Sequence, residues 1–356
     1  MELLLEIIFI LLGLVLLAKG ADFLVDGSSA IAKRFKIPEI IIGLTIVSIG
    51  TSLPELVISV NAAIKGENTI SMGNIVGSNF ANLFLIIGVC AAMRPLHIRK
   101  QTRFVDQPLV VFSTIILYLM VINDGFLTRF EGIAMLLMTI LYLAYNFLMA
   151  KYGKSMNAYS SKNEKEIEKE VEREQKDTKK GKLAKKIKKE YSKFEKKFPV
   201  LYSIIAIILG IFLLKVGGDI TVDNARLVAL AIGLSEKLIA ITIVAVGTSL
   251  PELITCVEAT KKGETDLAIG NIAGSQIFNI LLILGSSASI KPITNVFGFR
   301  EELLILIIGN LVYAIVPFIG EKHKINRWVG TIFVLFYFAY MGVKVATEIS
   351  ASVLWE

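Results

Sequence analysis

The strongest constraint on this chain is a 39-residue segment that occurs twice. Residues 50–88 and 247–285 align without a gap at a constant offset of 197, with 21 identities. Each copy begins GTSLPE inside an otherwise apolar run and continues with Gly-Asn, Gly-Ser and a further Asn. Polar groups at membrane depth are costly, so we expect them to face a cavity, one another or an ion. A duplicated apolar pair that Gly and Pro interrupt is typical of a transporter's binding site.

The composition is that of an integral membrane protein. The 356 residues are 54% hydrophobic, and apolar runs of at least about 18 residues recur along the chain. The net charge of +7 is local, because residues 151–197 carry 17 Lys and Arg against 9 Asp and Glu. This balance indicates one charged loop and argues against a nucleic-acid surface. Cys90 and Cys256 lie in apolar runs, which predicts no disulfide framework. The first run, from Leu3, lacks a basic start and a cleavage site, so we interpret it as a retained span.

We predict an all-α membrane protein with ten spans in two halves. The spans fall at roughly 3–25, 39–64, 70–92, 106–123, 130–149, 200–222, 238–260, 267–290, 301–319 and 327–347. The halves are 1–150, with its core motif at 43–93, and 199–356, with its core motif at 240–290. Five spans on each side of the 151–198 loop place the second half upside down relative to the first, which is an inverted-topology repeat.

The duplication extends upstream of the core segment. At the same offset Gly13, Gly20, Asp22 and Asp26 match Gly210, Gly217, Asp219 and Asp223. We therefore expect that whole five-helix halves were duplicated. We interpret the aspartates as interfacial groups that cap helices or pair with nearby Lys and Arg, in preference to ion ligands.

The distribution of Lys and Arg predicts the orientation in the membrane. Short connections rich in Lys and Arg alternate with connections poor in them, and the positive-inside rule assigns the rich ones to the cytoplasm. Both termini are then outside the cell membrane, and the 151–198 loop is cytoplasmic. We interpret that loop as a solvated linker, with binding of anionic lipid at 151–197 or regulation as alternatives.

The chemistry of the repeat favours a hard cation. Pro54 has no N–H, so the Gly50 carbonyl loses its helical donor and the Thr51 carbonyl is loosened. Ser48, Ser52, Glu55 and Ser59 share one helix face, and the second copy presents Thr248, Ser249, Pro251 and Glu252. The two glutamates carry a charge that matches one divalent ion, and hard cations take oxygen ligands. The absence of paired His and Cys in the motif argues against a site for soft-ligand transition metals.

The second helix of each copy adds further polar groups. Asn74, Ser78 and Asn82 are matched by Asn271, Ser275 and Asn279. The accompanying glycines, four residues apart, allow close helix approach. Ser78 and Asn82 offer a hydroxyl and an amide to the same cavity. For Asn74 and Asn271, hydrogen bonding between helices and contact with an ion are equally open.

These motifs resemble the alpha repeats of the cation/calcium antiporter superfamily. Two copies of GTSLPE, each followed by GN-x-x-GS-x-x-x-N, are most similar to the sodium/calcium exchanger family in its compact prokaryotic form. The resemblance covers nearly the whole membrane portion. It implies exchange of three Na⁺ for one Ca²⁺ by alternating access, with Sr²⁺ as a further divalent ion and no cofactor. It also implies that the spans at 3–25 and 200–222 slide across the core. We expect a monomer.

The resemblance also assigns ligands. Glu55 and Glu252 would bind Ca²⁺ with the carbonyls of Thr51 and Thr248. The Na⁺ ligands would come from Ser48, Thr51, Ser52, Glu55, Ser78, Asn82, Ala245, Thr248, Ser249, Glu252, Ser275 and Asn279. Pro54, Pro251, Asn74 and Asn271 would support these sites.

Several alternatives remain. Potassium-dependent relatives carry Asp where this chain has Asn279, which argues for K⁺-independent transport. The runner-up is a Ca²⁺/H⁺ antiporter, although that branch usually shows GN-x-x-E in its core helices. A cation channel is more often built from repeated subunits than from an inverted pair in one chain. An intramembrane enzyme has little support, because His97 and His323 have no carboxylate or Ser motif around them.

Overall fold

Long helices make up almost all of the chain. The computed structural model describes residues 2–35, 37–157, 200–231, 245–294, 296–319 and 323–353. Within these residues, eight helical stretches are long and apolar enough to cross a membrane, and a bent pair of helices makes a ninth. The eight stretches are α1 (Glu2–Phe35); α5, η2 and α6 (Asn68–Phe80, Ala81–Ile86, Ile87–Met93); η3 and α7 (Thr102–Asp106, Gln107–Asp124); α8 (Arg129–Asn157); α11 (Val200–Ala231); α15, η5 and α16 (Thr265–Phe278, Asn279–Leu284, Gly285–Ile290); η6 and α17 (Phe297–Phe299, Arg300–Ile319); and α18 (Arg327–Val353).

The bent pair occupies the predicted span 39–64. Its first arm joins α2 (Glu39–Ile42), η1 (Gly43–Val47) and α3 (Ser48–Thr51), and its second arm is α4 (Leu53–Lys65), at an angle of 50°. The matching span, predicted at 238–260, is described from α13 (Ala245–Thr248) and α14 (Leu250–Lys262) onward, and its first residues lie outside the described part. Both α4 and α14 end at a glycine with φ of +85°, Gly66 and Gly263, a conformation that glycine adopts without strain.

Three helices run further than the sequence predicted. α1 has 34 residues and α11 has 32, so each is about 50 Å long at 1.5 Å per residue. This length exceeds a hydrocarbon core of roughly 30 Å, and both helices must therefore tilt or project from the bilayer. α8 continues to Asn157, into the predicted loop, and residues 158–198 of that loop lie outside the described residues.

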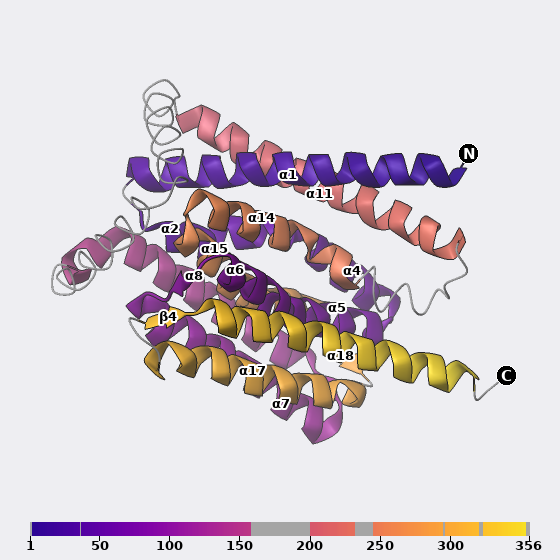
Figure 1. Ribbon diagram of the computed structural model, residues 1–356. Helices are drawn as coiled ribbons and strands as arrows, with labels where there is room; N and C mark the ends of the chain where they lie inside the picture. Colours follow the sequence, from indigo (N-terminus) through magenta and orange to yellow (C-terminus); the bar gives the residue numbers. More distant parts are fainter. Residues whose placement is uncertain are drawn as a thin grey trace.

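α1 and α11 form an antiparallel pair along one side of the bundle, beside α4 and α14 (Figure 1). Glycines set their spacing. A Cβ atom on Gly20 would lie 2.9 Å from the Gly210 carbonyl oxygen, and one on Gly217 would lie 2.8 Å from the Gly13 carbonyl oxygen. The upstream glycines of the duplication therefore meet each other across this interface, which lets the two backbones approach closely.

Two small sheets connect the halves of the chain. β1 (Leu96–His97) pairs with β4 (Lys324–Ile325), and β2 (Phe126–Leu127) pairs with β3 (Ile293–Thr294), both antiparallel. Each strand lies in a connection between spans. Every pairing therefore joins a connection of the first half to one of the second.

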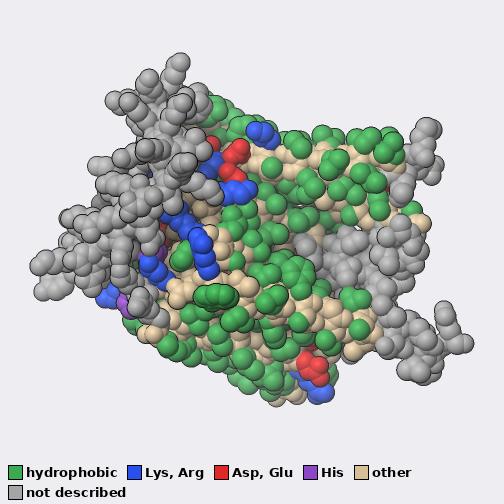
Figure 2. All heavy atoms as spheres, viewed as in Figure 1, with side chains coloured by type: hydrophobic (Ala, Val, Ile, Leu, Met, Phe, Trp, Pro, Cys, Tyr) green, Lys and Arg blue, Asp and Glu red, His purple; other side chains and the backbone are tan. Residues whose placement is uncertain are grey.

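The duplicated segments lie innermost. The stretches 68–93 and 265–290 are almost entirely buried, whereas α1, α8 and α18 expose many large apolar side chains. Apolar side chains cover most of the surface between the two ends of the bundle (Figure 2). In a membrane protein such side chains contact lipid, and the polar residues of the inner helices are shielded from it.

Candidate functional site

Each copy of the repeat breaks its helix at the same serine. Ser52 has φ and ψ of −87° and 11°, and Ser249 has −88° and 4°. Pro54 and Pro251 follow in the first turns of α4 and α14. Because proline has no N–H, the Gly50 carbonyl has no helical donor from Pro54, as the sequence predicts. The break thus places loosened backbone carbonyls beside the hydroxyls and carboxylates of the motif.

The two copies interlock at the centre of the bundle. Ser52 Oγ lies 2.9 Å from Glu252 Oε1 and 3.1 Å from Ser275 Oγ. Thr51 Oγ1 donates to Asn271 Oδ1 at 3.2 Å. These contacts join residues that are more than half the chain apart, so the structure brings the predicted site residues of both copies into one cluster.

The two glutamates form the charged part of this cluster. Glu55 and Glu252 are each 1% exposed. Ser78 Oγ donates to Glu55 Oε1 at 3.4 Å, and Glu252 accepts its hydrogen bond from Ser52. Within the described residues neither carboxylate is paired with a Lys or Arg. Two buried like charges without a cationic partner are unfavourable, and a bound cation would compensate both.

Several buried oxygen atoms of the two repeats have no hydrogen-bond partner among the described residues. Among the buried oxygens without a hydrogen-bond partner are Glu55 Oε2, Glu252 Oε2, Ser249 Oγ, Asn82 Oδ1 and Asn279 Oδ1. The described residues contain no group of three or more His, Cys, Asp or Glu with metal-ligand geometry. Two carboxylates with neutral oxygens are the donor set that Ca²⁺ and other hard cations take.

Asn74 and Asn271 hold the helices of each copy together. Asn74 Nδ2 donates to the Glu55 carbonyl at 3.1 Å and to Ser59 Oγ at 2.9 Å. Asn271 Nδ2 donates to Cys256 Sγ at 3.2 Å, and Cys256 is the counterpart of Ser59. This repeated geometry favours the role of hydrogen bonding between helices over direct contact with an ion.

The predicted backbone ligands differ in their surroundings. The Ser48 carbonyl accepts the Ser52 N–H at 3.0 Å, and Thr51 Oγ1 lies 3.4 Å from the same oxygen. Thr248 is buried. Ala245 is the first residue of α13, next to the undescribed segment 232–244.

Two buried polar residues, Asn79 and Gln276, were not predicted from the sequence. Asn279 Nδ2 donates to Asn79 Oδ1 at 3.0 Å, and Asn79 Nδ2 donates to the Gln276 carbonyl at 3.4 Å. The two residues occupy equivalent positions at the offset of 197, but they are not identical, so a count of identities hides them. The π-helical segments η2 and η5 follow in the same helices, and such segments are frequent at functional sites.

Comparison with known proteins gives a consistent result. A family model described as sodium/calcium exchanger protein matches residues 5–148 and 202–346. The chain is 34% identical to the sodium/calcium exchanger MaX1 of Methanosarcina acetivorans, over 94% of this chain and 97% of that protein. It is 32% identical to the putative antiporter CaxA of Alkalimonas amylolytica, over 94% and 96%. The solved structure of the sodium-calcium exchanger NCX_Mj, soaked with Na⁺ and Ca²⁺, superposes with a TM-score of 0.75 at 27% identity, over 95% of this chain and 98% of that one.

Proposed function

Because the chain belongs to the sodium/calcium exchanger family, we propose that it exchanges three Na⁺ for one Ca²⁺ across the membrane by alternating access, independently of K⁺. Members of this family transport Na⁺ and Ca²⁺ without a cofactor. The observation that carries the proposal is the buried cluster formed by both copies of one motif, in which Glu252 accepts a hydrogen bond from Ser52 of the other copy and Glu55 accepts one from Ser78. An ion there would be held by both halves at once.

The charge of the cluster accounts for coupling. Glu55 and Glu252 together balance one Ca²⁺, whereas three Na⁺ leave one positive charge over. Both ions need the same carboxylates, so they compete, and each must leave before the other binds. A cycle with this stoichiometry moves net charge, and the membrane potential contributes about 2.3 kcal/mol per charge per 100 mV.

We assign the ligands by position. Glu55 and Glu252, with the carbonyls of Thr51 and Thr248, would bind Ca²⁺, and Sr²⁺ is a suitable substitute because NCX_Mj crystals were also soaked with it. The Na⁺ sites would draw on the same four residues and on Ser48, Ser52, Ser78, Asn82, Ala245, Ser249, Ser275 and Asn279. Pro54, Pro251, Asn74 and Asn271 would shape the site without binding the ion.

The small sheets support an inverted repeat of two five-span halves, 1–150 and 199–356. The connection that holds β1 and the one that holds β2 lie one span apart, hence on opposite sides of a membrane. β3 is the counterpart of β1, yet it pairs with β2, while β1 pairs with β4. This exchange of partners is what two halves of opposite orientation would produce.

We further propose that both termini lie outside the cell membrane, that the 151–198 loop is cytoplasmic and that the protein acts as a monomer. The start of α1 and the end of α18 lie at the same end of the bundle (Figure 1). Most of the Lys and Arg side chains visible in Figure 2 gather toward the other end. That distribution agrees with the positive-inside rule.

Radiolabelled Ca²⁺ uptake into proteoliposomes tests the exchange. Vesicles loaded with Na⁺ are diluted into Na⁺-free buffer at matched pH, and a second set carries only a pH gradient with the potential clamped. We expect uptake with the Na⁺ gradient alone, unchanged by K⁺. Uptake driven only by the pH gradient would assign the protein to Ca²⁺/H⁺ antiport. Uptake with neither gradient would indicate a channel.

A further inference from the structure

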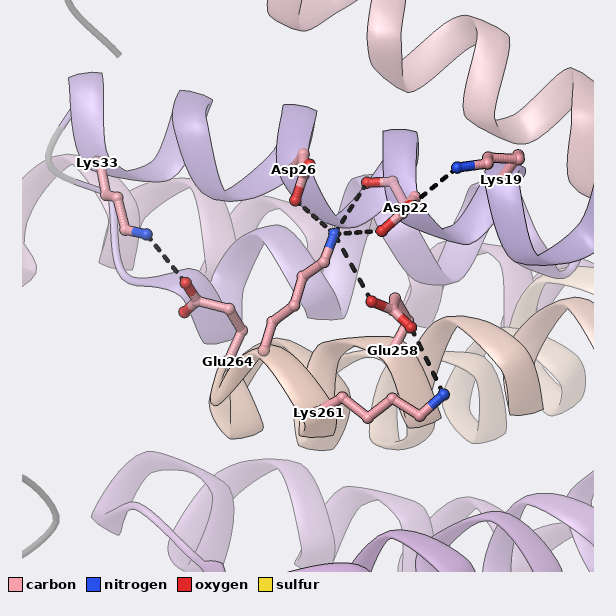
Figure 3. A network of polar contacts seen from close by, with 8 residues as sticks. Lys19, Asp22, Asp26, Lys33, Glu258, Lys261 and Glu264 are labelled. Carbon is pink, nitrogen blue, oxygen red and sulfur yellow. Dashed lines mark hydrogen bonds and ion pairs between the residues drawn. The ribbon is translucent and has the colours of Figure 1, made fainter. Parts of the chain in front are cut away.

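Lys262 joins the end of α14 to the long helix α1. It is the last residue of α14, and its Nζ lies 2.7 Å from Asp22 Oδ1 and 2.6 Å from Asp26 Oδ1, both on α1. Figure 3 shows Asp22 and Asp26 on one helix facing Glu258 on the other, and Glu258 Oε1 lies 3.8 Å from Lys262 Nζ. The contacts confirm that Asp22 and Asp26 pair with a basic residue. They also fix where α1 sits along α14.

A second ion pair strengthens the same attachment. Lys33, near the end of α1, places its Nζ 2.9 Å from Glu264 Oε1, in the turn that follows α14. In Figure 3 Lys33 and Glu264 lie to the left of Asp26 and Asp22. α1 is thus held to one end of α14 at two separate points.

The residues of this cluster occur again in the other half. At the offset of 197, Lys262 corresponds to Lys65, and Asp22 and Asp26 correspond to Asp219 and Asp223. The second set is not assembled here. Within the described residues Lys65 is exposed and forms no ion pair, and Asp219 pairs with its own neighbour Lys215 at 2.8 Å.

The helix packing has the same asymmetry. α1 packs extensively against α14, whereas α11 makes no comparable contact with α4 among the described residues. α11 instead meets α3, α13 and the start of α14, where Gly218 faces Pro251. Two halves that carry the same motif in unequal arrangements imply a second arrangement with their roles exchanged, in which α11 packs on α4.

We propose that Lys262 and Lys65 are positioning residues of two alternating ion-pair latches, one for each facing state. The Lys262–Asp22–Asp26 latch is closed in this structure. The Lys65–Asp219–Asp223 latch closes when α1 and α11 have shifted and the site opens to the opposite side. This inference rests on the proposed alternating access. The Lys33–Glu264 pair has no counterpart, because Leu230 stands where Lys33 does in the first half. The observed state therefore has one ion pair, Lys33–Glu264, that the alternative state lacks.

Matched variants at the two lysines test the latches. In full-length protein reconstituted in proteoliposomes, the apparent affinity for Ca²⁺ is measured separately at the two faces. Lys262→Gln destabilises the observed state, so the ratio of the affinities at the two faces shifts. Lys65→Gln shifts the ratio in the opposite direction. Partly exposed ion pairs are worth roughly a fivefold change in an equilibrium constant. Charge exchange, Lys262→Asp with Asp26→Lys, should restore the ratio.

A transport-independent readout separates this proposal from the exchange itself. Amide hydrogen exchange of purified protein compares residues 22–35 of α1 with residues 219–231 of α11. We expect Lys262→Gln to raise exchange in α1 and Lys65→Gln to leave it unchanged or lower it. If no Na⁺-driven uptake occurs in the parent protein, the proposed function fails. The hydrogen-exchange comparison still shows whether Lys262 and Lys65 stabilise different arrangements of α1 and α11.

Equal shifts of the same sign from both lysine variants, or no shift from either, would overturn the latches and leave the ion pairs as simple interfacial contacts. If Lys262→Gln does not fold, Asp22→Asn with Asp26→Asn removes the same latch from the other side.

Discussion

Gly270→Ala tests how tightly the site depends on one helix crossing. Gly270 of α15 lies against Gly43 of η1, and a Cβ atom there would overlap the Ile40 carbonyl oxygen and lie 3.1 Å from Gly43 Cα. Ordinary contacts of a Cβ are 3.4 Å or longer, so α15 must retreat by about 0.5 to 1 Å. Overpacking of this kind costs about 1 to 3 kcal/mol. Asn271, the next residue, would move away from Thr51 Oγ1, and a displacement of this size lowers activity roughly ten- to a hundredfold.

The duplication provides the control. Gly73 is the counterpart of Gly270, but a Cβ there would lie 3.5 Å from the Phe299 ring, which is an ordinary contact. Gly73→Ala should therefore keep the parent's uptake rate and thermal midpoint, helped by the higher helix propensity of alanine. Initial Ca²⁺ uptake and thermal unfolding are measured on both variants. Equal behaviour of the two would refute the argument that the Gly43–Gly270 contact positions the site.

Three further predictions concern the charges and the loop. Glu55→Gln and Glu252→Gln should each abolish Ca²⁺ uptake, because each removes half of the negative charge that compensates the ion. The thermal midpoint of each variant should stay near that of the parent. Near-normal uptake by either variant would rule out the ligand assignment. Deletion of 160–190 should preserve exchange if the loop is a solvated linker, and loss of uptake in a well-folded deletion would make it functional. Asn279→Asp replaces the amide that donates to Asn79 Oδ1 at 3.0 Å with a titratable group, so uptake should depend more steeply on pH across the neutral range. An unchanged pH profile would place residue 279 away from the transported ions.

The sequence was sufficient to predict most of the residues that form the central buried cluster. A carboxylate, hydroxyls and a proline in one apolar run can be read from either copy, and the offset of 197 identifies the partner residue for each. The helix break at Ser52 follows from Pro54 alone, because a missing N–H is a local property. For the same reason the ends of α4 and α14 at Gly66 and Gly263 follow from local sequence.

Other features depend on the packing of distant segments. That Ser52 contacts Glu252 of the other copy, rather than Glu55 of its own, depends on how α3 packs against α14. Asn79 acquires its role only when Asn279 is placed beside it. The full length of α1 could not be predicted, since an apolar run does not itself specify how far a helix continues beyond the membrane. Two-residue strands such as β1 have no periodicity to detect.

The pairing of β1 with β4 and of β2 with β3 also has consequences during synthesis. Leu96 leaves the ribosome long before its partner Ile325, and Phe126 long before Thr294. The surface of α1 around Gly13 and Gly20 is likewise synthesised long before α11, the helix that covers it. A half-finished chain inserted in the bilayer therefore holds exposed strand edges and an uncovered helix face until translation is almost complete. Such unfilled edges are sites of wrong pairing, so a chain that stops early should be recognised and degraded by membrane quality-control proteases rather than accumulate as an independent half.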